Sequence, residues 1–415
     1  MELFDLSDKT ERVILVGVQE NDGDDTEESL QELAELAKTA GAEVVGTVIQ
    51  KRERIHPGTY VGKGKIDEIR TLLNALDATG ITCDDELSPV QMNHLQQELE
   101  SKIMDRTLLI LDIFASRAVT KEGKIQVELA QLRYRAVRLV GLGSSLSRLG
   151  GGIGTRGPGE KKLEMDRRLI KERISQLKKE LEHVKKHREL LREGRKKDRV
   201  MTAAIVGYTN AGKSTLLNTL TDAGVLSEDK LFATLDPTTR LLELDGGQRI
   251  YLTDTVGFIR KLPHHLIEAF KSTLEEAKYA DVILHVVDAS NPQVEEQMFI
   301  VYETLRELGV KDKTIVTLFN KQDRLAGNEI LRDFKADYVL KISARTGLGL
   351  DELKNTLEKI LIGNQIYIER VLDYKDAGML QLVRKYGQLI EEKYTENGIE
   401  IKARVPKDIY GRLGE

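Results

Sequence analysis

A glycine- and lysine-containing segment at positions 207–214 constrains the fold of this chain more than any other feature. It reads GYTNAGKS, fits the pattern G-x-x-x-x-G-K-S/T and directly follows the apolar run at 200–206. Gly207 and Gly212 let the backbone curl so that its N–H groups point inward at a phosphate chain. A helix expected over 213–220 adds the positive end of its dipole. The segment therefore predicts a parallel α/β sheet that holds nucleotide phosphates where a helix begins.

Two side chains of this segment carry chemistry. Lys213 supplies a charge between the outer phosphates, and the Ser214 hydroxyl binds the Mg²⁺ that bridges them. The predicted phosphate-binding residues are Gly207, Tyr208, Thr209, Asn210, Ala211, Gly212, Lys213, Ser214 and Thr215. The segment indicates a nucleoside triphosphate but leaves its base open.

Two later segments select the base. NKQD at 320–323 follows a predicted strand, and the Asp323 carboxylate can accept two hydrogen bonds from guanine, which adenine cannot offer. SAR at 343–345 also follows a predicted strand, and the backbone N–H of Ala344 is expected to meet the guanine carbonyl. The predicted base-site residues, in which Asn320 and Lys321 brace the loop and cover the base, are Asn320, Lys321, Asp323, Ser343, Ala344 and Arg345. The sequence thus predicts a guanine nucleotide.

Two segments between these motifs are expected to respond to the terminal phosphate. In DTVG, Asp254 can hold Mg²⁺ through water and Gly257 can offer its N–H to that phosphate. In FATLD, Thr234 is our choice for the hydroxyl that joins Mg²⁺ only in the triphosphate state, with Thr238 and Thr239 as competitors. The segments add Phe232, Ala233, Thr234, Leu235, Asp236, Asp254, Thr255, Val256 and Gly257 to the predicted site. The predicted catalytic residues are Lys213, Thr234 and Gly257.

Phe258 occupies the position after the DTVG glycine, where many GTPases carry a glutamine that orients the attacking water. A phenyl ring cannot orient water by hydrogen bonding, so we expect slow intrinsic hydrolysis and a partner that completes the site. Packing of Phe258 beneath the loop is an equally compatible interpretation. His264 and His265 lie downstream and are interpreted as exposed loop residues.

Composition limits the other possibilities. Among 415 residues, no apolar stretch approaches the roughly 18–20 that a membrane span needs. The acidic N-terminus, MELFDLSDKTER, does not resemble a signal peptide. Cys83 is the single cysteine, so an internal disulfide or a cysteine-based metal site is excluded. We therefore expect a cytoplasmic protein with no membrane partner.

The charge is unevenly distributed. Residues 1–50 hold 3 Lys/Arg against 13 Asp/Glu, whereas residues 151–200 hold 17 against 9. That basic stretch belongs to a predicted pair of antiparallel coiled-coil helices, because apolar residues recur every seven positions from Leu163 to Leu191. Its glycine-rich tip, with the start of the second helix, supplies the candidate RNA contacts Arg148, Arg156, Lys161, Lys162, Arg167 and Arg168. A plain hairpin turn, a solvated helix face and a second nucleotide site in the tip stay open as alternatives.

The alternation of strands and helices predicts an α/β fold class in four parts. We expect a small α/β domain at 1–117 and an antiparallel helical hairpin at 118–197 with its tip at 147–160. A P-loop GTPase domain, a mostly parallel sheet with helices on both faces, follows at 198–362. A small α+β domain at 363–415 ends the chain, with a hairpin turn at 396–398.

The five nucleotide motifs in this order resemble the GTPases of the translation-factor class. GGGIGTRGPGEKKLEMDRRLI at 150–170, with GYTNAGKST, FATLDPTTR and DTVGFI, is similar to the HflX family, as are PGTYVGKGKIDEI at 57–69 and DRTLLILDIFASRA at 105–118. The resemblance spans about residues 10–360. It implies a Mg²⁺-dependent GTPase that binds the large (50S) ribosomal subunit and acts in ribosome splitting, rescue or biogenesis under stress. It also implies that the N-terminal domain and its loop contact ribosomal RNA.

Two other functions remain open at the level of sequence. A signalling or trafficking switch is one, although the C-terminus, GRLGE, is no prenylation box. A GTP-switched RNA-binding or assembly factor that does not act on mature ribosomes is the other. Sedimentation with ribosomal subunits separates them from a ribosome-acting GTPase. Off the ribosome we expect a monomer, because the helical hairpin can close within one chain.

Overall fold

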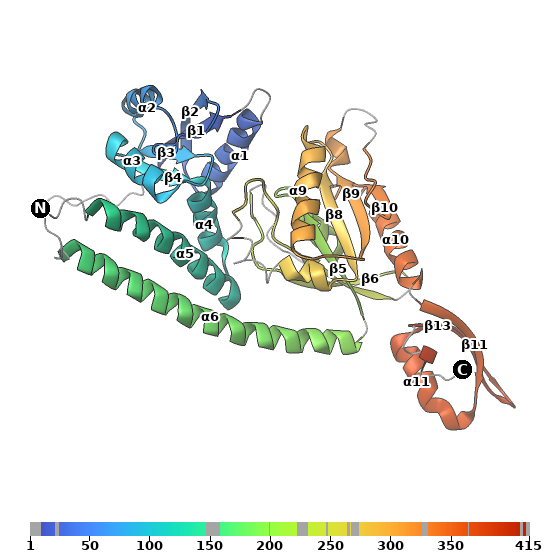
Figure 1. Ribbon diagram of the computed structural model, residues 1–415. Coiled ribbons are helices and arrows are strands. Elements are labelled where there is room, and N and C mark those ends of the chain that lie inside the picture. Colours follow the sequence, from blue (N-terminus) through green and yellow to red (C-terminus); the bar gives the residue numbers. More distant parts are fainter. Residues whose placement is uncertain are drawn as a thin grey trace, which may run out of the picture. The chain divides into compact units, whose positions relative to one another are not determined.

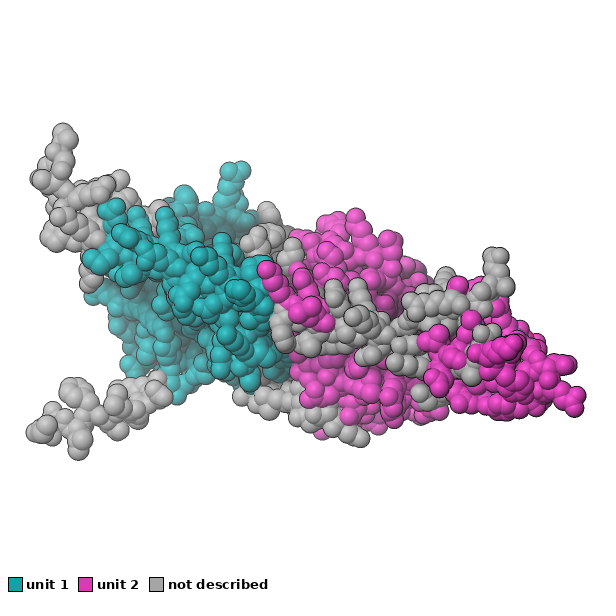
Figure 2. Space-filling model, turned by 90° about the horizontal axis from the view of Figure 1, so that it is seen from below, with its two compact units in different colours: residues 1–185, 228–236, 256–274 teal, residues 186–227, 237–255, 275–415 magenta. Residues whose placement is uncertain are grey.

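The computed structural model describes residues 10–20, 25–146, 158–198, 200–221, 231–245, 248–263, 266, 274–325, 331–363, 365–406 and 410–411 (Figure 1). The predicted RNA contacts Arg148 and Arg156 and the histidines His264 and His265 lie outside these residues, as do the side chains of Lys161 and Lys162. The chain forms two compact units (Figure 2). The first comprises residues 1–185, 228–236 and 256–274, and the second comprises 186–227, 237–255 and 275–415. The predicted four-part division stays a prediction.

The first unit is built on a four-stranded parallel sheet with strand order β2-β1-β3-β4. Its strands are β1 Arg12–Gln19, β2 Glu43–Lys51, β3 Gly80–Cys83 and β4 Lys102–Asp105. Its helices are α1 Thr26–Thr39, α2 Lys63–Ala75, α3 Pro89–Leu99 and α4 Arg106–Arg117. Buried aliphatic residues fill β1 almost without interruption, as expected of a strand covered on both faces.

Local capping explains where two of these helices begin. Ser88 accepts a hydrogen bond from the backbone N–H of Gln91, whose side chain returns one to the Ser88 N–H, and Pro89 occupies the first helical position. Ser88 followed by Pro89 predicts from the sequence alone a helix that begins here, and the structure confirms it. Helix α4 has no counterpart in the sequence analysis; Asp105 caps it by accepting a hydrogen bond from the Leu108 N–H.

The predicted helical hairpin is present as α5, Lys121–Leu146, and α6, Pro158–Asp198. Arg173 of α6 bonds Glu128 of α5, and Arg167 donates to the Leu139 carbonyl at 2.6 Å, so the helices run antiparallel. Their apolar seam consists of Ile125, Leu129, Leu132, Ile174, Leu177, Leu181 and Val184. The seven-residue repeat therefore identified the buried stripe of α6 between Ile174 and Val184.

The second unit contains a six-stranded sheet with order β10-β9-β8-β5-β7-β6, in which only β6 and β7 pair in antiparallel fashion. Its strands are β5 Met201–Gly207, β6 Thr238–Glu243, β7 Arg249–Asp254, β8 Val282–Asp288, β9 Thr314–Asn320 and β10 Tyr338–Lys341. Its helices are α7 Lys213–Thr221, α9 Val294–Glu307 and α10 Leu350–Gly363, with the short 3₁₀ helix η1 Gln322–Arg324. This is the predicted mostly parallel sheet of a P-loop domain.

A three-stranded antiparallel sheet of order β11-β13-β12 completes the second unit. It comprises β11 Gln365–Leu372, the 3₁₀ helix η2 Tyr374–Asp376, α11 Ala377–Tyr386, β12 Gln388–Thr395 and β13 Gly398–Pro406. Leu380 and Val383 of α11 pack on Ile399 and Ile401 of β13, which is the predicted α+β arrangement. Within the described ranges, no helix combines the length and apolar character needed to cross a membrane.

Candidate active site

The segment at 207–214 is a tight loop between β5 and α7. A Cβ atom on Gly207 would lie 2.2 Å from the Val286 carbonyl oxygen of β8. Gly212 has a φ of +98°, and a Cβ there would lie 2.3 Å from Nδ2 of Asn320. Asn210 also adopts a left-handed backbone, with a φ of 60°. Both glycines are therefore required by their neighbours in the sheet as well as by the curl of the loop.

Lys213 begins α7 and is buried inside this loop. Its Nζ donates a hydrogen bond to the Tyr208 carbonyl at 2.7 Å, which holds the ammonium group within the curl. Burial lowers the pKa of Lys213 to about 8, and the Asp254 carboxylate only partly opposes this effect. Phosphate oxygens that bind beside a buried ammonium group stabilise its charged form.

Ser214 and Asp254 lie side by side, although 40 residues separate them in the chain. The Ser214 hydroxyl donates to Oδ2 of Asp254 at 2.7 Å, and Asp254, the last residue of β7, is fully buried. A hydroxyl and a carboxylate are hard oxygen donors of the kind that Mg²⁺ prefers. The two residues fit a magnesium ion beside the phosphate loop.

Asn320 ties the phosphate loop to the SAR loop. Its Nδ2 donates to the Ala211 carbonyl at 2.8 Å, and its Oδ1 accepts from the Ala344 N–H at 2.8 Å. The side chain is buried. The predicted bracing by Asn320 thus has a definite geometry. The N–H of Ala344 thus donates to Asn320 in this structure, and its hydrogen bond to the guanine carbonyl stays a prediction.

Asp323 presents a carboxylate at the exposed edge of the base loop. The Ser343 hydroxyl donates to its Oδ1 at 2.6 Å, and this hydrogen bond lowers the pKa of Asp323 below its ordinary value. The SAR loop therefore keeps Asp323 ionised and oriented, as acceptance of two hydrogen bonds from guanine requires.

Asp288 is a site residue that the sequence analysis missed. It ends β8, and its Oδ2 accepts from Nζ of Lys321 at 2.7 Å. Lys321 has a φ of 64°, a left-handed conformation that this ion pair helps to hold. The available signal was a carboxylate directly after the apolar stretch at 282–287.

The predicted site residues are divided between the two units. The phosphate loop, Asp254, Thr255 and both base motifs belong to the second unit, whereas 232–236 and Val256–Gly257 belong to the first. Phe258 is only 1% exposed, which agrees with the packing interpretation of its ring. The roles of Thr234 and Gly257 at the terminal phosphate stay predictions.

A phosphate loop before a helix, with a strand-end carboxylate and a guanine-type base loop, defines a P-loop GTPase. Three family models match the chain: "GTP-binding GTPase N-terminal" at 27–115, "GTP-binding GTPase Middle Region" at 117–195 and "50S ribosome-binding GTPase" at 202–321. The chain belongs to the HflX family of GTPases. The GTPase HflX of Lacrimispora saccharolytica is 67% identical to it over 414 residues, which is 100% of this chain and 98% of that protein.

A more distant relative extends the match across bacteria. The GTPase HflX of Escherichia coli is 45% identical over 416 residues, which is 99% of this chain and 97% of that protein. Among solved structures, the crystal structure of SsGBP in complex with GDP is 28% identical, with a TM-score of 0.48, covering 85% of this chain and 98% of that one.

Proposed function

We propose that this GTPase associates with the large (50S) ribosomal subunit in the cytoplasm and acts in ribosome splitting, rescue or biogenesis under stress. The observation that carries the proposal is the match of residues 202–321 to the "50S ribosome-binding GTPase" family. The family already shows that the chain is a GTPase. The proposal adds the 50S subunit as its binding partner. RNA-binding and ribosome association of this chain follow from the same proposal.

GTP hydrolysis in this site is proposed to depend on Mg²⁺. When bound, the ion neutralises charge that develops on the outer phosphate oxygens. The Ser214 hydroxyl would bind it directly and the Asp254 carboxylate through water, since these two oxygens already lie 2.7 Å apart. Lys213 holds the outer phosphates, and Asp323 orients the guanine. Thr234 and Gly257 are proposed to respond to the terminal phosphate.

Slow hydrolysis by the isolated protein is part of the proposal. The Phe258 ring is buried and has no group that could orient an attacking water. The ribosome is therefore expected to accelerate turnover by completing or ordering the site.

The positive charge of the helical hairpin is proposed to bind the phosphates of ribosomal RNA. Helix α6 carries 15 Lys/Arg against 9 Asp/Glu. Arg168 is well suited to a phosphate, since 80% of its side chain is exposed and it pairs with Glu172 one turn along the same helix. Arg167, in contrast, donates to the Leu139 carbonyl, which gives it a part in joining α5 and α6. Binding to RNA through such cations weakens steeply with salt.

The test compares GTP turnover with and without large subunits across a salt series, together with sedimentation. One variant replaces the hairpin cations, defined as Lys161, Lys162, Arg167 and Arg168, with Ala, and a companion variant keeps Arg167 because it joins α5 and α6. A matched control removes four exposed lysines elsewhere, Lys38, Lys278, Lys311 and Lys359. The hairpin variant should sediment more weakly and show a smaller salt dependence, by about one unit of slope per lost contact, with intrinsic turnover unchanged.

Two results would count against the proposal. If the parent protein does not sediment with large subunits in the presence of a GTP analogue, a GTP-switched RNA-binding factor that does not act on mature ribosomes is favoured. If the parent hydrolyses GTP rapidly alone and ribosomes change nothing, the interpretation of Phe258 is wrong.

A further inference from the structure

The phosphate loop contains a tight turn in which Thr209 is a corner residue. The Ala211 N–H donates to the Tyr208 carbonyl at 3.3 Å, which places Thr209 and Asn210 at the two central positions of the turn. Asn210 has a φ of 60°, and a positive φ at this third position is typical of a type II turn. The loop itself therefore fixes the place from which the Thr209 side chain extends.

The two corner side chains differ in their exposure. Asn210 is exposed, whereas Thr209 is only 6% exposed, although residues of loops and turns usually lie at the protein surface. Among the described residues, none supplies a hydrogen-bond partner to the buried Thr209 hydroxyl. Such a group costs free energy, because it has given up its hydrogen bonds to water. A buried hydroxyl of this kind in a binding loop indicates a partner that arrives with the ligand.

The Thr209 hydroxyl belongs to the end of the loop that receives the outer phosphates. The Tyr208 carbonyl, which directly precedes Thr209 in the chain, accepts a hydrogen bond from Nζ of Lys213 at 2.7 Å. In P-loop GTPases the lysine of the loop supplies its charge to the outer phosphates. Thr209 therefore lies beside the part of the site where GTP and GDP differ.

Other hydroxyl groups near the phosphate loop already have partners. The Ser214 hydroxyl donates to Asp254 at 2.7 Å. The Thr255 hydroxyl donates to the Ile205 carbonyl at 2.8 Å. Thr209 differs from both, since its hydroxyl can accept a hydrogen bond and donate one without breaking an existing contact.

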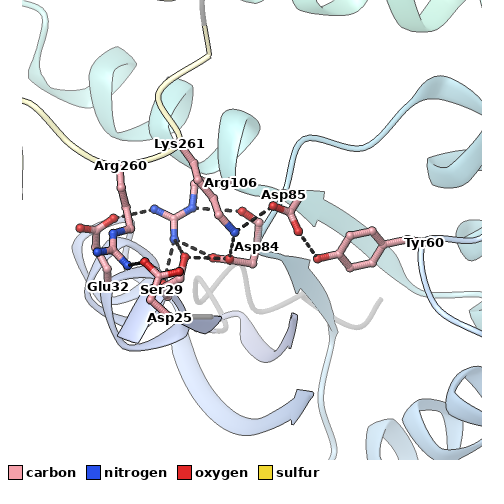
Figure 3. A network of polar contacts seen from close by, with 9 residues as sticks. All are labelled: Asp25, Ser29, Glu32, Tyr60, Asp84, Asp85, Arg106, Arg260 and Lys261. Carbon is pink, nitrogen blue, oxygen red and sulfur yellow. Dashed lines mark hydrogen bonds and ion pairs between the residues drawn. The ribbon is translucent and has the colours of Figure 1, made fainter. Parts of the chain in front are cut away.

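The stretch after DTVG has its polar side chains bound elsewhere. In the described residues 258–263, Phe258 contributes only a ring, and the polar side chains are those of two cations. Arg260 pairs with Asp25, and Nζ of Lys261 donates at 2.5 Å to Asp84, which directly follows β3 (Figure 3). Lys261 also adopts a left-handed, strained backbone with a φ of 53°. No side chain within 258–263 is thus left to orient an attacking water.

We propose that Thr209 is a catalytic residue for GTP hydrolysis: its hydroxyl accepts a hydrogen bond from the attacking water and donates one to an oxygen of the terminal phosphate. The inference rests on the proposed interpretation of Phe258, whose ring cannot orient that water. As the bond between the water oxygen and the terminal phosphorus forms, the bond from that phosphorus to the bridging oxygen of GDP breaks. One proton of the water passes to an oxygen of the released phosphate, and the Thr209 hydroxyl keeps its own proton.

This role is consistent with slow hydrolysis by the isolated protein. A neutral hydroxyl orients water through a single hydrogen bond, and the net contribution of one such bond corresponds to a change of about tenfold in rate. Thr209 therefore sustains the intrinsic rate, and the larger acceleration is left to the ribosome.

The experiment measures single-turnover GTP hydrolysis by the full chain without ribosomes. Thr209→Val keeps the branched shape but loses the hydroxyl, so it should hydrolyse GTP about tenfold more slowly, with GDP affinity within twofold of the parent. Thr209→Ser keeps the hydroxyl and should retain most of the rate, within about threefold. Thr356→Val is the matched control and should match the parent rate. Thr356 is also 6% exposed, but it lies on α10 and donates to the Glu352 carbonyl.

Denaturant unfolding separates a catalytic role from a structural one. Thr209→Val removes a buried hydroxyl that has no partner among the described residues, so its denaturation midpoint without nucleotide should equal or exceed that of the parent. Thr356→Val removes a hydroxyl that is hydrogen-bonded, so it should not raise the midpoint. A merely structural Thr209 predicts instead a lower midpoint and weaker GDP binding in Thr209→Val.

Four results overturn the inference. The first is a Thr209→Val rate equal to or above the parent rate, and the second is an equal slowing in Thr356→Val. The third is a Thr209→Ser rate as low as that of Thr209→Val. The fourth is a slowing in Thr209→Val that comes with a lower midpoint and a loss of GDP affinity.

The parent protein tests the premise separately. Rapid hydrolysis by the parent without ribosomes contradicts the interpretation of Phe258 and the inference with it. A slow parent that ribosomes accelerate, with Thr209→Val at the parent rate, overturns the inference alone.

Discussion

Asn320→Ala is the substitution that best tests how the base loop and the phosphate loop cooperate. The Asn320 side chain is 2% exposed and makes two hydrogen bonds of 2.8 Å, one to the Ala211 carbonyl and one from the Ala344 N–H. Alanine removes both partners at once and leaves a buried acceptor and a buried donor. The loops that should grip opposite ends of the nucleotide then lose their direct connection.

The expected magnitude follows from the two orphaned groups. A buried polar group left without a partner costs roughly 1–3 kcal/mol, so the free energy of unfolding should fall by about 3 kcal/mol. If about 2 kcal/mol of this appears as reordering of the loops on binding, GDP affinity falls by roughly 30-fold. Gly212→Ala should act in the same direction, because its Cβ would lie 2.3 Å from Nδ2 of Asn320.

Calorimetric titration with GDP and denaturant unfolding measure the two effects. Asn355→Ala is the control: Asn355 is exposed on α10, and its removal should change stability by less than about 0.5 kcal/mol. GDP affinity of Asn320→Ala within threefold of the parent would refute the coupling between the loops. A loss of affinity equal in Asn320→Ala and Asn355→Ala would refute it as well.

Three further predictions concern single residues. Asp323→Asn should shift preference from guanine towards xanthine nucleotides, since the amide donates where the carboxylate accepted, and nucleotide titrations that show an unchanged GTP affinity would contradict this. Burial lowers the pKa of Lys213 to about 8, and bound phosphates should raise it. Lys213 is then charged before and after binding below about pH 8, but binding takes up a proton at higher pH. GDP affinity should therefore fall by up to about tenfold per pH unit above that point, and calorimetry in two buffers detects the proton. Asp236→Ala should lower the free energy of unfolding by about 2 kcal/mol, because Asp236 accepts from the N–H groups of Val119 and Thr120 at 2.9 and 2.8 Å; an unchanged denaturation midpoint would show that these bonds contribute nothing.

Much of the fold could be predicted because its signals are local. The capping pattern at Ser88, the seven-residue repeat of α6 and the turn at 396–398 each depend on residues a few positions apart, and the structure confirms all three. The phosphate loop is also local, since its backbone conformation depends on its own glycines. Helix α4 could not be assigned from periodicity, because an apolar run such as Thr107–Ala115 lacks a polar face that distinguishes a helix from a buried strand.

The site residues that could be predicted are those that follow the ends of predicted strands. Asp254, Asn320 and Asp323 follow predicted strands, and carboxyl ends of parallel strands meet at one edge of a sheet. The hydrogen bond from the Ala344 N–H to Asn320 was not predictable, because it depends on which buried oxygen the folded chain brings within 3 Å. Asp288 was overlooked for the same reason, since its partner Lys321 lies 33 residues away.

The sequence by itself determined that this chain is a P-loop GTPase, because the residues that bind phosphate and guanine are fixed by motif and spacing. Only the tertiary structure decided that the segments 228–236 and 256–274 belong to the first compact unit. Lys261 and Asp84 are 177 residues apart, and no periodicity or motif links them. Their pairing exists because the fold places a carboxylate at the end of β3 and a strained turn beside it. A long-range ion pair of this kind depends on which distant segments the folded chain brings together. The local sequence around either residue carries no signal for it.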